Sequence, residues 1–322
     1  MSYSQIIILE DFIMPRKKKS QQLFHEYFKE WIELYKVGAI RPVTLQKYYM
    51  SQQKIMELAP NLTMGELNRR NYQTLLNHYA LTHEKQTTMD FHHQLKSAIL
   101  DAVEEGVIEK NPTRKIIIKG KAPREKKQKF LNQYELQKLF KQLNLKDTIN
   151  WDWFILLVAK TGLRFSEALA LTPEDFDFQN QKLTVRRTWN YKKTKGEFQP
   201  TKNESSKRKI QLDWKTAMQF SQLVKNMEPD KPIFIKGRVF NSTVNNRLKV
   251  LCSKAEIPVI TIHGLRHTHA SLLLFAGVSI ASVARRLGHS SMTTTQETYL
   301  HIIRELENQD SDKIMRHLST LM

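Results

Sequence analysis

The sequence predicts a mainly α-helical protein with a small antiparallel β-sheet, organised in about two domains. The chain has 322 residues, 40% of them hydrophobic, so it is long enough to bury a full core. Apolar residues recur at three- and four-residue spacing through residues 21–109, where Gly and Pro are rare. Strand-like composition occurs in two short stretches of the second half, residues 182–189 and 207–212.

The first domain is expected to be entirely helical and to span residues 20–112. Phe28, Trp31 and other apolar residues with helical spacing predict its first helix, and the helical pattern ends before Pro112. A short N-terminal lead, residues 1–19, precedes this domain. Three alternatives remain open for the lead: a strand, an oligomer contact or a disordered segment.

A basic linker, residues 113–129, is expected to join the two domains. The stretch 110–129 holds nine Lys or Arg residues and one acidic residue. Such a run of positive charge either lies along a polyanion such as DNA or is simply solvated. The sequence leaves both alternatives open.

The second domain is expected to span residues 130–322 and to combine helices with the small sheet. Asn132 is positioned to cap a helix, and the bulky residues 151–160 predict a buried helix that ends at Gly162. The two strand-like stretches flank a loop in which we expect a further short strand. The residues after 299 have helical composition with spaced apolar positions, and we expect them to act as an oligomerisation tail.

The charge of the chain limits the partners that it can have. Lys and Arg total 51 against 32 Asp and Glu, a net charge of +19, which favours a polyanionic partner, nucleic acid before anionic membrane. No apolar run approaches the roughly 20 residues that a membrane span needs, and no signal peptide is recognised. The single cysteine, Cys252, excludes an internal disulfide and indicates a cytoplasmic protein.

The stretch HGLRHTHA, residues 263–270, combines three histidines with one arginine. His263 and His267 would share a helix face, as zinc ligands do. However, the glutamate expected between them is missing, and Arg266 would repel a cation, so zinc is not expected. His263 and Arg266 lie three residues apart and can present an imidazole and a guanidinium to one phosphate. His267 and His269 are interpreted as incidental helix residues.

A second stretch suited to an anion follows. Ser279 and Gly288 predict the start and the end of a short helix, so His289 lies just past a helix end. Tyr299 follows ten residues later in another helical stretch.

Arg164 lies just after the predicted helix break at Gly162 and is a further candidate for the same anion site. Glu167, three residues later, either reaches back to orient the Arg164 guanidinium or is an ordinary surface glutamate. The spacing allows both.

The motifs TGLRFSEALAL, PTKNESSKR, HGLRHTHAS and LGHSSMTTTQETYLH, in this order, resemble those of the tyrosine recombinase, or phage integrase, family. The resemblance covers about residues 20–305. It implies a helical core-binding (SAM-like) domain followed by an α+β tyrosine recombinase catalytic domain. It also implies roles for six residues: Arg164 and Arg266 bind the scissile phosphate, Lys202 assists the leaving oxygen, His263 and His289 handle protons and contact the phosphate, and Tyr299 is the nucleophile.

The resemblance implies a site-specific DNA recombinase, an integrase that cleaves and rejoins DNA through a 3′-phosphotyrosyl intermediate. It would integrate or excise a phage or mobile element. Its partners would be double-stranded DNA with core-type recombination sites and three further copies of the chain in a homotetramer on two DNA sites. An excisionase or a host DNA-bending factor would be an accessory partner, and no membrane partner is expected.

The expected chemistry requires no cofactor. Two arginines can offset the negative charge that builds up on a phosphodiester under attack, so no metal ion is needed. A tyrosyl phosphoester is labile enough for a DNA hydroxyl to displace it, so the bond energy is conserved without ATP.

Other functions remain as alternatives. The same tyrosine chemistry serves Xer-like resolution of chromosome or plasmid dimers and the relaxation of supercoiled DNA. A DNA-binding protein without catalysis is an alternative of another class, and a metal-dependent nuclease is disfavoured because no carboxylate cluster is recognised. Many phage and transposon integrases carry an arm-binding domain before the helical domain, whereas only about 20 residues precede it here, which puts arm-type DNA binding in doubt.

Overall fold

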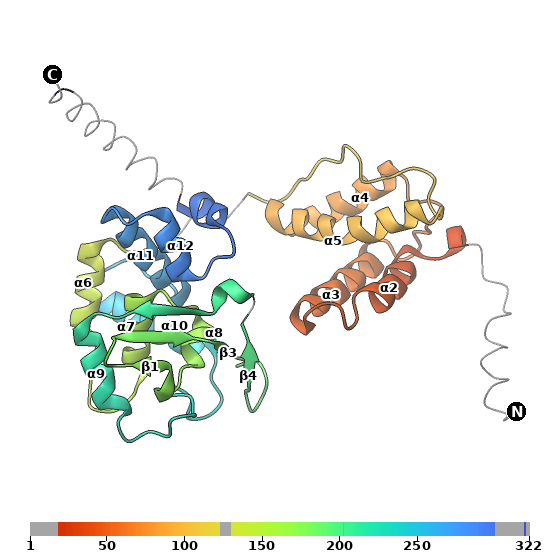
Figure 1. The fold of residues 1–322 in the computed structure, drawn as a ribbon. Coiled ribbons are helices and arrows are strands. Elements are labelled where there is room, and N and C mark those ends of the chain that lie inside the picture. The colour runs from red at the N-terminus through yellow and green to blue at the C-terminus, as the bar shows by residue number, and fades with distance from the viewer. Residues whose placement is uncertain (1–18, 123–129, 202, 300–318, 320–322) are drawn as a thin grey trace, which may run out of the picture. The chain divides into compact units, whose positions relative to one another are not determined.

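A computed structural model describes residues 19–122, 130–201, 203–299 and 319 (Figure 1). The chain divides into two compact units between Glu125 and Lys126. The predicted boundaries at 112/113 and 129/130 stay predictions. Nearly all of the predicted N-terminal lead and oligomerisation tail lies outside the described residues. Within the described ranges, no helix combines the length and the apolar character needed to cross a membrane.

The described part of the first unit is helical, as predicted. Helix α2 packs against α3 and α5, and α4 packs against α3 and α5. The Trp31 indole N–H donates to Asp101 Oδ2 at 2.6 Å, which ties α2 to α5. The elements are η2 (Lys19–Gln21), α2 (Phe24–Tyr35), α3 (Pro42–Leu58), α4 (Arg69–Ala80) and α5 (Lys85–Glu104).

The chain that follows α5 is hydrogen-bonded to the first unit. Gln73 on α4 donates to the carbonyl of Ile117 and accepts from its N–H, both at 2.8 Å. The N–H of Lys121 donates to the carbonyl of His83 at 2.8 Å. The first part of the predicted basic linker therefore runs along this unit, while residues 123–129 lie outside the described ranges.

The second unit combines helices with two small antiparallel sheets (Figure 1). Its helices are α6 (Gln133–Lys141), α7 (Trp151–Thr161), α8 (Phe165–Leu169), η3 (Pro173–Asp175), η4 (Glu204–Ser206), α9 (Trp214–Val224), α10 (Asn241–Lys254), α11 (Ile262–Phe275) and α12 (Ile280–Leu287). Residues 292–299 are also helical. Its strands are β1 (Phe176–Asp177), β2 (Lys182–Val185), β3 (Arg187–Trp189), β4 (Phe198–Pro200) and β5 (Arg208–Gln211).

The sheet content differs in detail from the prediction. One sheet has the order β1-β2-β5, and a separate antiparallel pair joins β3 to β4. The predicted strand 182–189 is interrupted at Arg186, whose side chain forms ion pairs with Asp175 and Glu174 at 2.6 and 2.8 Å. A single sheet was therefore a wrong prediction. The predicted class, mainly α with a small antiparallel component, is confirmed, with two small sheets in place of one.

The helix boundaries that local residues predicted are confirmed. Asn132 caps α6 in a capping box with Glu135. Gly162 ends α7 and Gly288 ends α12, each with the positive φ that glycine adopts without strain. Ser279 caps α12 through the N–H of Ser282. These caps fix where the segments after α7 and α12 begin.

Buried aromatic and aliphatic side chains around α7 form the core of the second unit. Phe154 is fully buried, and its ring meets those of Trp151, Phe165 and Phe234 edge to face at centroid distances of 5.1–5.7 Å. Helix α11 packs against α7, and α12 packs against both α11 and β5. The core thereby holds the ends of α7 and α12 close to one another.

We predict that Phe154→Ala lowers the free energy of unfolding by about 3–5 kcal/mol, because it leaves a cavity at the centre of this core. Urea unfolding of the full chain measures the loss. Trp214→Ala is the matched control, since this aromatic side chain is 66% exposed and its loss should change stability by no more than about 0.5 kcal/mol. Equal effects of the two substitutions would contradict this description of the core.

Candidate active site

The C-terminal turn of α12 is the meeting point of three arginines from distant parts of the chain. Arg208 Nε donates to the carbonyl of Arg286 at 2.6 Å, Arg266 Nη2 to that of Leu287 at 2.8 Å, and Arg164 Nη2 to that of Gly288 at 3.0 Å. Carbonyls at a helix end lack helical partners and carry the negative end of the helix dipole. A guanidinium group donates hydrogen bonds to these carbonyls and also places a positive charge at the negative end of the dipole.

Arg266 is the most enclosed of the three, with 3% of its surface exposed. Its Nη1 donates to the carbonyl of Gly162 at 2.6 Å, so one guanidinium joins the ends of α7 and α12. Burial and the nearby charge of Arg164 lower the pKa of Arg266 to about 9, which leaves it protonated at neutral pH. Among the described residues, it keeps further N–H donors without a hydrogen-bond partner.

Glu167 fixes the orientation of the other two arginines. Its Oε1 accepts from Arg164 Nη1 at 2.7 Å, and its Oε2 accepts from Arg208 Nη2 at 2.9 Å. Oε2 also accepts from the backbone N–H of Arg164, which caps α8. Glu167 is 1% exposed. Of the two alternatives for this residue, the structure supports the one in which it orients Arg164.

The pKa of Glu167 reflects opposing effects. Burial raises the pKa, but the positive charges of Arg208 and Arg164 and the hydrogen bonds that they donate hold it below its usual value. The carboxylate is therefore ionised at neutral pH and compensates part of the charge of the arginines.

His289 follows the glycine that ends α12, and its ring lies among the same charges. Burial and the charges of Arg266 and Arg164 lower its pKa to about 4, so the ring is neutral at pH 7. The Thr295 hydroxyl lies 2.7 Å from Nδ1. In the tautomer in which this hydroxyl donates to Nδ1, the Nε2–H is a donor available to an anion.

His263 is located near the start of α11, one turn before Arg266. Desolvation of its ring and the charges of Arg266 and Arg164 lower its pKa, which favours the neutral form. The ring packs edge to face against His267 with centroids 4.7 Å apart. His263 thus belongs to the same electrostatic environment as the two arginines.

Tyr299 lies in the helical stretch 292–299 and is 2% exposed. Its hydroxyl is 2.9 Å from Nδ1 of His267, and the ring centroids are 5.8 Å apart. Burial raises the pKa of Tyr299 to about 12, although the charge of Arg266 acts in the opposite direction. The interpretation of His267 as incidental was therefore wrong.

His269 is a structural residue of the α7–α11 interface. Its Nδ1 lies 3.0 Å from the carbonyl of Ala159, and its Nε2 accepts from Arg286 Nε at 2.8 Å. Burial and the charge of Arg286 lower its pKa to about 3. It is neutral and enclosed, so incidental was the wrong description of this histidine too.

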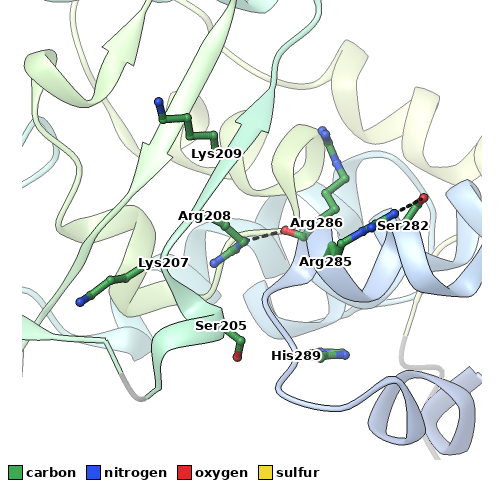
Figure 2. A pocket seen from close by; sticks show the side chains of 8 residues that line it. All are labelled: Ser205, Lys207, Arg208, Lys209, Ser282, Arg285, Arg286 and His289. Carbon is green, nitrogen blue, oxygen red and sulfur yellow. Dashed lines mark hydrogen bonds between the residues drawn. The ribbon is translucent and has the colours of Figure 1, made fainter.

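An open pocket of about 520 Å³ lies beside the arginines, between β5 and α12 (Figure 2). Lys207, which directly precedes β5, and Lys209 on β5 line one side of it, and Arg285 of α12 and His289 of the following loop line the other. The full lining is Ser205, Lys207, Arg208, Lys209, Ser282, Arg285, Arg286 and His289. Its concentration of positive charge suits a phosphate backbone.

Of the six residues expected at the site, the structure brings together Arg164, Arg266, His263, His289 and Tyr299. Lys202 lies outside the described residues. Sequence reasoning missed Arg208 and the contact of His267; the position of Arg208 in KRKIQL after the loop was a weak signal for the former. In the described ranges, no group of three or more His, Cys, Asp or Glu side chains is arranged to hold a metal ion.

Comparison with known proteins identifies relatives of the whole chain and of its second half. Residues 129–305 match the model of the phage integrase family. An integrase of Staphylococcus phage L54a is 25% identical over 330 residues, which span 90% of this chain and 92% of the relative. The ICEBs1 integrase of Bacillus subtilis strain 168 is 29% identical over 234 residues, 68% of this chain and 62% of the relative.

Solved structures share the fold. The Tn1549 transposon integrase in complex with transposon right end DNA superimposes with a TM-score of 0.70 at 19% identity, covering 89% of this chain and 99% of the other. A lambda integrase dimer bound to a COC′ core site gives a TM-score of 0.61 at 16% identity, covering 85% and 94%.

We predict that Glu167→Gln lowers the free energy of unfolding by about 2 kcal/mol at pH 7, because two arginines lose their ionised partner. The pKa of Glu167 is lowered in the folded state, so its stabilisation is present above the unfolded value of 4.5 and disappears as the pH falls through the folded value. Urea unfolding at pH 7 and near pH 4 should therefore show a smaller difference between the two proteins in acid.

Glu204→Gln is the control for this prediction, because Glu204 is 87% exposed in its ion pair with Lys207 and such pairs contribute little. A destabilisation by Glu167→Gln that grew towards acid pH would contradict the assigned direction.

Proposed function

The chain belongs to the phage integrase family, and from this premise we propose that it cleaves and rejoins DNA through a covalent bond between Tyr299 and a 3′ phosphate. It is a tyrosine-type site-specific recombinase, an integrase of a phage or mobile element. Arg164 and Arg266 bind the scissile phosphate, and His263 and His289 contact it as neutral rings.

The observation that carries this proposal is the shared C-terminal turn of α12. Arg164 and Arg266 donate to the successive carbonyls of Gly288 and Leu287, so their guanidinium groups lie next to each other. Each keeps N–H donors that no other described residue uses. When the tyrosine attacks, negative charge builds up on the non-bridging oxygens, and fixed donors stabilise it without reorganising.

The substrate that we propose is double-stranded DNA with core-type sites. In support, the pocket between β5 and α12 adds lysines and an arginine to the phosphate site, and the net charge is +19. Exchange of two duplexes requires four strand cleavages, and each protomer supplies one Tyr299. We therefore propose a homotetramer on two sites, with an excisionase or a host DNA-bending factor as accessory partner; the lambda integrase neighbour is a dimer on core-site DNA.

The proposed reaction also needs a proton for the departing 5′ oxygen. An alkoxide leaves very slowly at neutral pH, and a positioned acid contributes about 10²–10⁴ in rate. We assign this role to Lys202 because of its motif TKNESSKR, with His263 as the rival. No metal ion or other cofactor enters the proposed mechanism.

We expect Tyr299→Phe to bind its DNA site with unchanged affinity but to form no covalent adduct. A nicked substrate that traps the intermediate, followed by denaturing electrophoresis, measures the adduct. Tyr191→Phe is a matched control, because this tyrosine packs against Phe165 and is given no chemical role. An adduct that persists in Tyr299→Phe would assign the nucleophile to another residue.

We expect Lys202→Ala to slow cleavage of normal DNA by about 10²-fold or more and to recover most of the rate on DNA whose bridging 5′ oxygen is sulfur. A thiolate, with a thiol pKa of about 8.5, departs without protonation. Arg266→Ala should stay slow on both substrates because it loses phosphate stabilisation. Rescue of His263→Ala by sulfur, with none for Lys202→Ala, would transfer the role of acid to His263.

A further inference from the structure

The family resemblance gives His263 and His289 a general role in proton handling, but neither has been assigned the removal of the proton from Tyr299. Tyr299 is 2% exposed, enclosed by the apolar side chains of Ala270, Leu274, Val283 and Leu287. Water is therefore largely excluded from its ring. A proton that leaves the hydroxyl needs an acceptor supplied by the protein.

Spontaneous ionisation supplies little of the reactive phenolate. With a pKa of about 12, about one tyrosine in 10⁵ is ionised at pH 7. A phenol attacks phosphorus effectively only if a base takes its proton as the new bond forms.

His267 provides a base at hydrogen-bonding distance. Its Nδ1 lies 2.9 Å from the Tyr299 hydroxyl, within the 2.6–3.2 Å reach of proton transfer. A phenol is the stronger donor of the pair, so the neutral imidazole with its proton on Nε2 is the tautomer that matches this contact. The ring of His263 also packs edge to face against the ring of His267.

Resting on the proposed function, in which Tyr299 is the nucleophile, we propose that His267 is the general base that takes its proton. As the bond from the tyrosine oxygen to phosphorus forms, the O–H bond breaks and the proton moves to Nδ1. The bond from phosphorus to the 5′ oxygen breaks, and that oxygen is protonated by the separate acid. In the rejoining step the separate acid, now in its deprotonated form, takes the proton of the attacking 5′ hydroxyl, and the His267 imidazolium returns its proton to the departing Tyr299 oxygen.

The arrangement of α11 fits a division of roles between its polar side chains. Arg266 donates to the carbonyls of Gly162 and Leu287, and the phosphate is proposed to bind its remaining N–H donors. His267, the next residue, faces Tyr299. Phosphate binding and proton removal are thus served by consecutive residues of one helix, and the imidazolium forms close to the dianionic transition state that offsets its charge.

The test uses the full chain and single-turnover cleavage of a nicked core-site substrate at pH 7. We expect His267→Ala to cleave about 10²-fold more slowly than the wild type. Added imidazole and its methylated derivatives should restore part of the rate, and the restored rate should rise with the basicity of the added base. His93→Ala is the matched control, since His93 is exposed on α5 of the first unit, and its rate should neither fall nor respond to imidazole.

His267→Gln is the second variant, because it keeps a polar side chain of similar reach that cannot accept a proton. We expect the same loss of about 10²-fold, with the melting temperature unchanged. Cleavage within about threefold of wild type by either variant would overturn the proposal. A defect that no imidazole lessens, or that all of them lessen equally regardless of basicity, would also overturn it.

Tyr299→Phe separates this proposal from the proposed function. If that variant still forms the adduct, the nucleophile itself is misassigned and both fail. If it forms none while the His267 variants cleave normally, only the assignment of the base fails.

Discussion

Three buried or half-buried arginines share the C-terminal turn of one helix, and the rest of the site depends on this contact. The carbonyls of Arg286, Leu287 and Gly288 each accept from a different guanidinium. The two preceding carbonyls, of Ala284 and Arg285, accept from the N–H groups of His289 and Gly288 as α12 ends. Each of these carbonyls at the helix end therefore accepts a hydrogen bond. Positive charge is concentrated where the helix dipole is negative.

Such an assembly is stable only because the like charges are compensated. Enclosing a guanidinium costs hydration, so each needs acceptors in fixed directions. Glu167 supplies a carboxylate to Arg164 and Arg208, and the α12 carbonyls supply the remainder. Gly288 is required here for two reasons: its φ is +68°, and a Cβ would lie 2.9 Å from Nη1 of Arg208. The donors that remain free are consequently rigid before any substrate arrives, which is the condition for electrostatic stabilisation of a transition state.

The sequence predicted those features that local residues determine. Ser279 and Gly288 mark the ends of α12, and Asn132 marks the start of α6, because capping depends on a few neighbouring residues. From the order of the motifs, Arg164, Arg266, His289 and Tyr299 were predicted to be residues of the site. The sequence did not predict the contact of Glu167 with Arg208 or that of His267 with Tyr299, since these partners lie 41 and 32 residues apart. The break between β2 and β3 lies at Arg186, which pairs with the earlier residues Glu174 and Asp175, and composition does not reveal these contacts.

The guanidinium groups held by α12 are the proposed binding site of the scissile phosphate. A crystal structure of Tyr299→Phe bound to its core-site DNA measures this directly. We expect one phosphate whose non-bridging oxygens lie within about 3 Å of nitrogens of both Arg164 and Arg266, with Arg266 still donating to Gly162 and Leu287. A complex in which the phosphate nearest residue 299 contacts neither arginine would contradict it.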